Sequence, residues 1–263
     1  MSDGTLEASR AAARKVTAIT SGKGGVGKTF LAANLAAALA RQGQRVLVLD
    51  ADLGLANLDV VLNLFPKVTL HEVFAGKCKL EEAIVAAPGG FSVLLAGSGM
   101  VEYSRMTPEL RDQLRDVLNQ VAPRFDQVLL DTGAGISDVV LYTVSLAHRV
   151  IVVATPEPTS LTDAYATIKV LATTQQRRRI SLVVNQARRP GDGRVVRQQL
   201  QQVVDRYVSP GLDSPIQIDL LGELPNDSAV RDAVLRRQLL VETLPGAPAA
   251  VAVGQLATRL IDA

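Results

Sequence analysis

The chain has 263 residues, 48% of them apolar, which suffices for one large α/β domain or two small ones. Its 28 lysines and arginines nearly balance its 26 aspartates and glutamates, and the net charge of +2 argues neither for nor against nucleic-acid binding. The single cysteine, Cys78, excludes an internal disulfide and any multi-cysteine metal or iron–sulfur site within one subunit, as is typical of proteins in a reducing cytoplasm.

Residues 1–14 are mostly small or polar and lack the apolar segment of a signal peptide, so we expect a mobile leader. No apolar run approaches the length of a membrane span, and we expect a soluble cytoplasmic protein. Short linkers and the absence of repeats predict one domain over residues 15–263.

Within that domain, short apolar runs alternate with longer helical patterns. The runs predicted to be strands are Val16–Thr20, Arg45–Leu49, Phe91–Ala96, Gln127–Leu130, Arg149–Ala154, Ile180–Asn185 and Ile216–Leu221. Helices are predicted over residues 28–41, 79–86, 107–121, 137–147, 159–174, 193–207 and 226–238. Several strands lack polar alternation, as expected when both faces of a strand are buried. The pattern predicts a doubly wound α/β fold, with a mostly parallel sheet and helices on both faces.

The octapeptide directly after the first predicted strand fits the phosphate-binding pattern G-x-x-x-x-G-K-[ST]. Its residues are Gly22, Lys23, Gly24, Gly25, Val26, Gly27, Lys28 and Thr29. The glycines allow successive backbone N–H groups to surround a polyphosphate at a helix N-terminus, where the helix dipole favours anions. Lys28 is expected to reach the β- and γ-phosphates of ATP, and the Thr29 hydroxyl to hold Mg²⁺.

The glycines of this loop also fit a second pattern, the G-x-G-x-x-G of dinucleotide-binding folds. Asp50 even ends the next strand about where such folds carry the acid that binds the ribose. Lys28 and Thr29 favour the ATPase loop, because in the dinucleotide pattern the third glycine packs the helix against the strand and no lysine is needed.

Carboxylates follow two predicted strands at the edge where a doubly wound sheet binds its ligand. Asp52 is the candidate to orient or activate the attacking water and to take part in the metal site, and Asp50 would support it or the Mg²⁺ shell. Asp131 closes an apolar strand and fits the acid that holds Mg²⁺ through its water shell, ahead of a glycine-bearing loop at 132–136. The alternatives are a solvated acidic turn for the first pair and a helix cap for Asp131.

Asn185 closes another apolar strand and is the candidate to recognise adenine, with the backbone turn that ends at Pro225 covering the base. A turn-forming asparagine is the alternative. His71 and His148 are expected to be structural or exposed. The segment 177–206 carries eight arginines, which indicates either a solvated face or a site for DNA phosphates. Residues 251–261 predict a helix whose apolar face packs against the rest of the protein and makes little or no membrane contact.

With these residues in place, the chain resembles the deviant-Walker-A ATPases of the MinD/ParA family. The distinguishing residue is the second lysine of the loop, Lys23. Segments 50–59, 131–136 and 157–169 are most similar to the FleN/FlhG flagellar-number regulators within this family. The resemblance implies a P-loop fold and an ATP-dependent homodimer in which Lys23 contacts the nucleotide of the partner subunit, much as an arginine finger does.

The resemblance also implies catalytic roles for Lys23, Lys28 and Asp52 in a slow, dimer-dependent ATPase that restrains flagellar transcription or assembly. The implied partners are an activator of flagellar genes and a signal-recognition-type GTPase. Three alternatives stay open: a ParA-like partition ATPase on nonspecific DNA, a MinD-like division-site ATPase at the inner face of the membrane, and an amide ligase of the same fold. A nitrogenase-like reductase of this fold would need cluster cysteines at the dimer interface, which Cys78 alone cannot supply.

Overall fold

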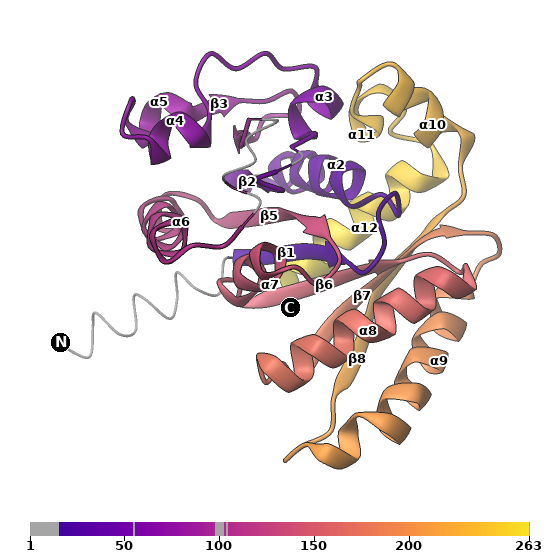
Figure 1. The fold of residues 1–263 in the computed structure, drawn as a ribbon. Coiled ribbons are helices and arrows are strands. Elements are labelled where there is room, and N and C mark those ends of the chain that lie inside the picture. Colours follow the sequence, from indigo (N-terminus) through magenta and orange to yellow (C-terminus); the bar gives the residue numbers. More distant parts are fainter. Residues whose placement is uncertain (1–15, 55, 98–102, 104, 263) are drawn as a thin grey trace.

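The computed structural model describes residues 16–54, 56–97, 103 and 105–262. The expected leader, residues 1–14, lies outside the described residues. An eight-stranded sheet with the order β3-β4-β2-β5-β1-β6-β7-β8 forms the centre of the molecule (Figure 1). The strands are β1 (Val16–Ser21), β2 (Val46–Ala51), β3 (Ile84–Ala86), β4 (Ser92–Leu94), β5 (Gln127–Ala134), β6 (Arg149–Ala154), β7 (Arg179–Ala187) and β8 (Gln217–Pro225).

All strand pairs except β3–β4 are parallel, which confirms the predicted mostly parallel sheet. The strands are buried on both faces because successive side chains enter two different cores. In β2, for example, Leu47 and Leu49 belong to one core, whereas Val46 and Val48 belong to the other.

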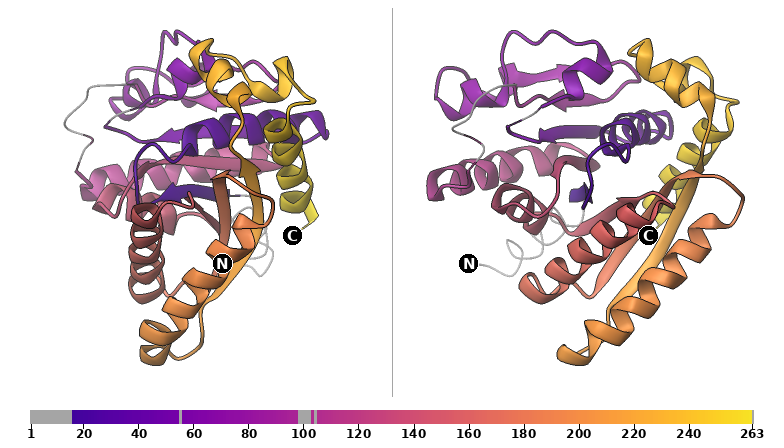
Figure 2. Two further views of the ribbon diagram at one scale, coloured as in Figure 1. Left: turned by 90° about the vertical axis from the view of Figure 1, so that its right-hand side faces the viewer. Right: turned by 45° about the vertical axis from the view of Figure 1, so that its right-hand side comes forward.

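Helices cover both faces of the sheet, as predicted (Figure 2). One face packs against α4 (Leu70–Phe74), α5 (Leu80–Ala83), α6 (Pro108–Val121), α7 (Asp138–Ser145), α8 (Pro158–Thr174) and α9 (Asp192–Tyr207). The other face packs against α2 (Lys28–Arg41), α3 (Leu58–Leu62), α10 (Ser228–Leu235), α11 (Leu240–Thr243) and α12 (Pro248–Asp262). Within the described residues, no helix is both long enough and apolar enough to cross a membrane.

The structure differs from the predicted elements mainly between residues 52 and 90. The predicted helix 79–86 ends at Ala83, and the β-branched pair that follows begins β3, which runs antiparallel to β4 at the sheet edge. The short helices α3, α4 and α11 were not predicted. They are too short to show a clear helical period in the sequence.

The predicted C-terminal helix forms as α12 and packs as expected. Val253, Leu256, Ala257 and Leu260 are buried against α2 and β8, whereas Ile261 of the same predicted helix is 37% exposed. Nearly all of α2 is buried as well, because it lies between the sheet and α12. The helix that begins at the phosphate-binding loop is therefore held on both sides.

Candidate functional site

The glycine-rich loop joins β1 to α2 at the carboxyl edge of the sheet. β1 lies between β5 and β6, so the loop opens at the point where the strand order reverses. Gly25 (φ 77°) and Gly27 (φ 95°) adopt left-handed backbone conformations that other residues rarely adopt. A Cβ on Gly24 or Gly25 would have no neighbour within 4 Å, and both glycines are exposed, so this part of the loop is open to a ligand.

The two lysines of the loop point in different directions. Lys28 is buried and its Nζ donates a hydrogen bond to Ser21 Oγ at 2.9 Å. Burial lowers the Lys28 pKa, and the nearby carboxylates of Asp131 and Asp52 partly counteract that change. Lys28 therefore lies beside the acidic cluster.

Lys23 instead contacts the first turn of α8. Its Nζ donates to Glu157 Oε2 at 3.0 Å and to Thr159 Oγ1 at 3.1 Å. Both members of the ion pair are well exposed, at 39% for Lys23 and 50% for Glu157. The structure thus holds this lysine on the surface, by a contact that the sequence alone did not predict.

The three predicted carboxylates converge because β2 and β5 are in register. Asp50 lies directly opposite Asp131, and both are buried. Burial raises the pKa of Asp131 to about 7, although Thr29 and Lys28 act in the opposite direction. Burial, together with the charge of Asp131, also raises the pKa of Asp50 well above its usual value.

Asp50 and Asp52 have different surroundings. The Asp50 carboxylate accepts backbone N–H bonds from Asp52 at 3.2 Å and from Leu58 at 3.3 Å, so it shapes the loop that follows β2. Asp52 is half-buried and lies against the end of β5, where a Cβ on Gly133 would be 3.2 Å from Asp52 Oδ1. Residues 132–134 of the predicted loop 132–136 are therefore part of β5, and Gly133 at the end of this strand lies close to Asp52, the predicted water-orienting acid.

A cleft of about 430 Å³ continues from the phosphate-binding loop between the ends of β7 and β8 and helix α10. Asn185 and Pro225, the two residues expected at the base, both line it. Its wall also contains residues that the sequence analysis missed, namely Phe30, Val61, Gln186, Asn226, Asp227, Val230, Arg231 and Val234. The sequence gives one indication of these residues. Several of them follow the end of the last strand, and this end lies at the same edge of the sheet as the phosphate-binding loop.

Asn185 also supports the phosphate-binding loop. Its Nδ2 donates to the Val26 carbonyl at 2.8 Å, and its Oδ1 accepts from the Gln186 N–H at 2.8 Å. A Cβ on Gly27 would lie 2.4 Å from Asn185 Nδ2, so a glycine is required there for packing as well as for its backbone conformation. The Asn185 side chain thus both lines the cleft and contacts the phosphate-binding loop.

The donor set suits a magnesium ion that arrives with a nucleotide. Asp131 Oδ1 is buried without a hydrogen-bond partner, and the Thr29 side chain lies at hydrogen-bond distance of the same carboxyl group. The described residues contain no group of three or more His, Cys, Asp or Glu that could hold a metal by themselves. Mg²⁺ usually keeps several waters and takes only one or two carboxylates plus phosphate oxygens, so the residues present fit it.

Several arginines of the 177–206 segment have structural contacts. Arg177 donates to the carbonyls of His148, Val144, Ser145 and Ala147 at the end of α7. Arg178 donates to Ala172 and Ser214, Arg179 pairs with Asp219, and Arg197 donates to the Ile218 carbonyl. The solvated basic face is therefore smaller than the count of arginines suggests. The histidines are as expected: His71 is buried and stacks on Tyr103, and His148 is exposed.

Two relatives match the chain over nearly its full length. The antiactivator FleN of Pseudomonas aeruginosa is 39% identical over 246 residues, which are 94% of this chain and 86% of FleN. The flagellum site-determining protein YlxH of Helicobacter pylori is 32% identical over 250 residues, 94% of this chain and 82% of YlxH.

Among solved structures, the septum site-determining protein MinD from Pyrococcus horikoshii OT3, complexed with Mg-ADP, superposes with a TM-score of 0.72. It is 27% identical, and the match covers 92% of this chain and 94% of MinD. Residues 17–241 match the model of the CobQ/CobB/MinD/ParA nucleotide binding domain. That match spans the loop, the acidic cluster and the cleft. The chain is therefore a member of the CobQ/CobB/MinD/ParA family of nucleotide-binding domains.

Proposed function

We propose that this chain is an ATP-hydrolysing dimeric switch that regulates flagellar number or biosynthesis. One observation carries the proposal: a complete phosphate-binding loop with the second lysine, Lys23, occurs in a chain that matches two flagellar regulators almost end to end. The family contains ATPases, and the cleft of about 430 Å³ beside the loop, lined by Lys28 at one end, supports the proposal that a nucleotide binds there.

The residues divide the work as follows. The backbone of residues 22–27 surrounds the phosphates, and Lys28 supplies a fixed positive charge from a buried position. Asp52, the half-buried member of the acidic cluster, orients the attacking water. Thr29 and Asp131 hold Mg²⁺, which neutralises phosphate charge when it is bound. Asn185 and the turn at Pro225 contact the base.

Lys23 acts on the partner subunit in this proposal. Its contact with Glu157 and Thr159 keeps the ammonium group at the surface of its own subunit, where a second copy can approach. A cation supplied by one copy to the phosphates of the other makes ATP the link between the two. Dimerisation then depends on ATP, and hydrolysis releases the dimer.

Three variants test the assignment by light scattering and phosphate release, each with ATP and Mg²⁺. Lys23→Ala should bind ATP as a monomer, and Asp52→Ala should dimerise but lose most phosphate release. Lys77→Ala replaces an exposed lysine outside the phosphate-binding loop. It is the matched control and should behave as wild type. An ATP-dependent dimer in the Lys23 variant, or unchanged turnover in the Asp52 variant, contradicts these roles.

The flagellar assignment is tested in cells by deleting the gene and counting flagella by electron microscopy. More flagella per cell, restored by the wild-type gene but not by Asp52→Ala, is the expected result. The partners we propose are a transcriptional activator of flagellar genes and a signal-recognition-type GTPase, each examined by pull-down with and without ATP.

A MinD-like role in division is the second candidate, because the chain superposes on MinD over nearly its whole length. Minicells after deletion, with normal flagellar number, would favour it. Salt-sensitive, ATP-dependent binding to DNA would instead favour a ParA-like role.

A further inference from the structure

A second cavity lies between α3 and the turn that joins α10 to α11, and these helices lie at the same end of the molecule in every view (Figures 1 and 2). Its volume is about 310 Å³. Leu62 and Leu239 are buried and give the cavity an apolar floor, while Asn63 and Gln238 are exposed and place amide groups at its rim. The cavity thus offers both apolar and hydrogen-bonding contacts.

Large apolar side chains are exposed beside this cavity. Phe65 is 82% exposed and Leu235 is 71% exposed, the two highest values for large apolar side chains among the described residues. Leu64, the neighbour of Phe65, lines the cavity, and so does Arg237, two residues after Leu235. Val60 on α3 is a further exposed apolar residue, at 46%. Exposed apolar side chains gathered beside a cavity indicate a binding surface.

Two residues on opposite walls of the cavity have left-handed backbone conformations. Asn63, at the end of α3, has φ 52°, and Arg237, just after α10, has φ 53°. Residues other than glycine rarely adopt this conformation, and those that keep it often lie at binding sites. Both walls are therefore fixed by turns that the surrounding structure imposes.

The same surface carries more positive than negative charge. Its exposed cations are Lys67, Arg231, Arg236 and Arg237. No ion pair within the described part of the chain involves any of these four. The exposed carboxylates of the same segments, residues 58–67 and 228–243, are Asp232 and Glu242. An excess of exposed cations favours an acidic partner.

We propose that this surface, named here the α3–α10 surface, binds an acidic segment of a partner protein. A bulky apolar side chain of that segment would enter the cavity between Leu64 and Leu239, and Phe65 and Leu235 would pack beside it. Carboxylates of the segment would meet the four cations.

The proposal does not depend on the function proposed above. Leu64, Leu239, Phe65 and Leu235 do not line the nucleotide cleft. Val61 lines both the cleft and the cavity, so it is left unchanged in the test.

Two other occupants fit less well. Lipid acyl chains form no hydrogen bonds, whereas Asn63 and Gln238 border the cavity with amide groups that a peptide backbone can meet. A second copy docked symmetrically would bring the four cations of each copy together, and like charges repel.

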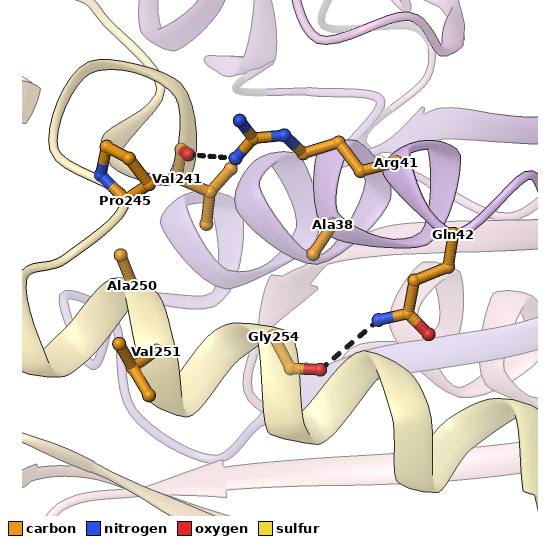
Figure 3. A pocket seen from close by; sticks show the side chains of 8 residues that line it. All are labelled: Ala38, Arg41, Gln42, Val241, Pro245, Ala250, Val251 and Gly254. Atoms are coloured by element: carbon orange, nitrogen blue, oxygen red, sulfur yellow. Dashed lines mark hydrogen bonds between the residues drawn. The ribbon is translucent and has the colours of Figure 1, made fainter.

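A pocket of about 230 Å³ between α2, α11 and α12 provides the control. Its polar side chains are already engaged, because Arg41 and Gln42 donate to backbone carbonyls of α11 and α12 (Figure 3). Val251 on the edge of this pocket is 47% exposed, so it matches Val60 in residue type and in exposure.

The test is phage display of random peptides of about 12 residues on wild-type protein, followed by fluorescence anisotropy of the enriched peptides. The enriched sequences should combine acidic residues with a bulky apolar residue. Val60→Asp, Phe65→Asp and Arg237→Glu should each weaken binding by about tenfold or more. The matched controls Val251→Asp and Arg188→Glu should stay within about twofold of wild type.

Several results would overturn the proposal. Enrichment of no peptide, or of peptides without acidic residues, contradicts the proposed partner. Equal loss in Val60→Asp and Val251→Asp, or no loss in Phe65→Asp, removes the α3–α10 surface as the site. Phe65-dependent sedimentation with anionic phosphatidylglycerol vesicles, or Phe65-dependent self-association without peptide, would assign the surface to lipid or to a second copy.

Two further measurements separate this proposal from the others. Circular dichroism of each variant checks that the fold is retained. Calorimetry should show that Val60→Asp and Phe65→Asp bind ATP as the wild type does. A wild-type protein that bound the peptides but not ATP would contradict the function proposed above and leave the α3–α10 surface established.

Discussion

Replacing Asp131 by asparagine should change how the stability of the nucleotide-free protein depends on pH. In the folded protein burial raises the Asp131 pKa to about 7, whereas an ordinary aspartate has a value of 3.8. Between these values the folded protein binds more protons than the unfolded chain, so its stability falls as the pH rises. The full change in the free energy of unfolding is on the order of 4 kcal/mol. This is the difference between the two pKa values, 3.8 and about 7, multiplied by about 1.36 kcal/mol per pKa unit.

The side-chain amide of the Asp131→Asn variant cannot ionise, so the substituted protein escapes this loss. Urea unfolding of both proteins at about pH 5.5 and about pH 8, without nucleotide or Mg²⁺, measures the effect. The stability of Asp131→Asn relative to wild type should rise by about 2 kcal/mol between the two pH values. Removal of the Asp131 charge also relieves Asp50, which adds to the change in the same direction.

A relative stability that is the same at both pH values would refute the reasoning. The matched control is Asp116→Asn, which changes an exposed carboxylate on α6. It should leave the pH dependence of the wild-type protein in place.

Three further substitutions test the site and its support. Gly22→Ala places a Cβ 2.2 Å from a backbone carbonyl oxygen of α8, so it should abolish ATP binding measured by calorimetry. In Gly24→Ala the new Cβ has no neighbouring atom within 4 Å, so this variant should keep the fold and its melting temperature. Lys28→Ala removes a buried charge from the phosphates and should weaken ATP binding by about tenfold or more in the same assay. Arg177→Ala leaves carbonyls at the end of α7 without their charged hydrogen-bond donor. The free energy of unfolding, measured in urea, should therefore fall by about 2 kcal/mol. Arg188 is exposed, and Arg188→Ala should leave the free energy of unfolding unchanged.

The order of strands and helices was predictable because each buried strand is a short apolar run followed by a longer helical pattern. The position of Asp131 and Lys28 at one edge followed from the same logic, since parallel strands end together. The antiparallel strand β3 was missed because three residues, Ile84–Ala86, carry no readable alternation. Its pairing with β4 depends on a contact at the sheet edge and not on its own composition.

The cleft wall was harder to predict than the loop. Gln186 and Arg231 belong to segments far apart in the sequence, and only the pairing of β7 with β8 brings them to the phosphate-binding loop. The contact of Lys23 with Glu157 was not predictable for the same reason, because 134 residues separate the two. A motif identifies the residues that meet a ligand, but their other contacts require the tertiary structure.

The two lysines of the loop differ in how freely each can move. An ion pair as exposed as that of Lys23 and Glu157 is worth less than about 1 kcal/mol, so the Lys23 chain can swing away at little cost. Lys28, buried beside Ser21 and Asp131, has no comparable freedom, because leaving would strand polar groups in the interior. Two identical side chains five positions apart therefore give the loop one rigid cation and one with a long reach.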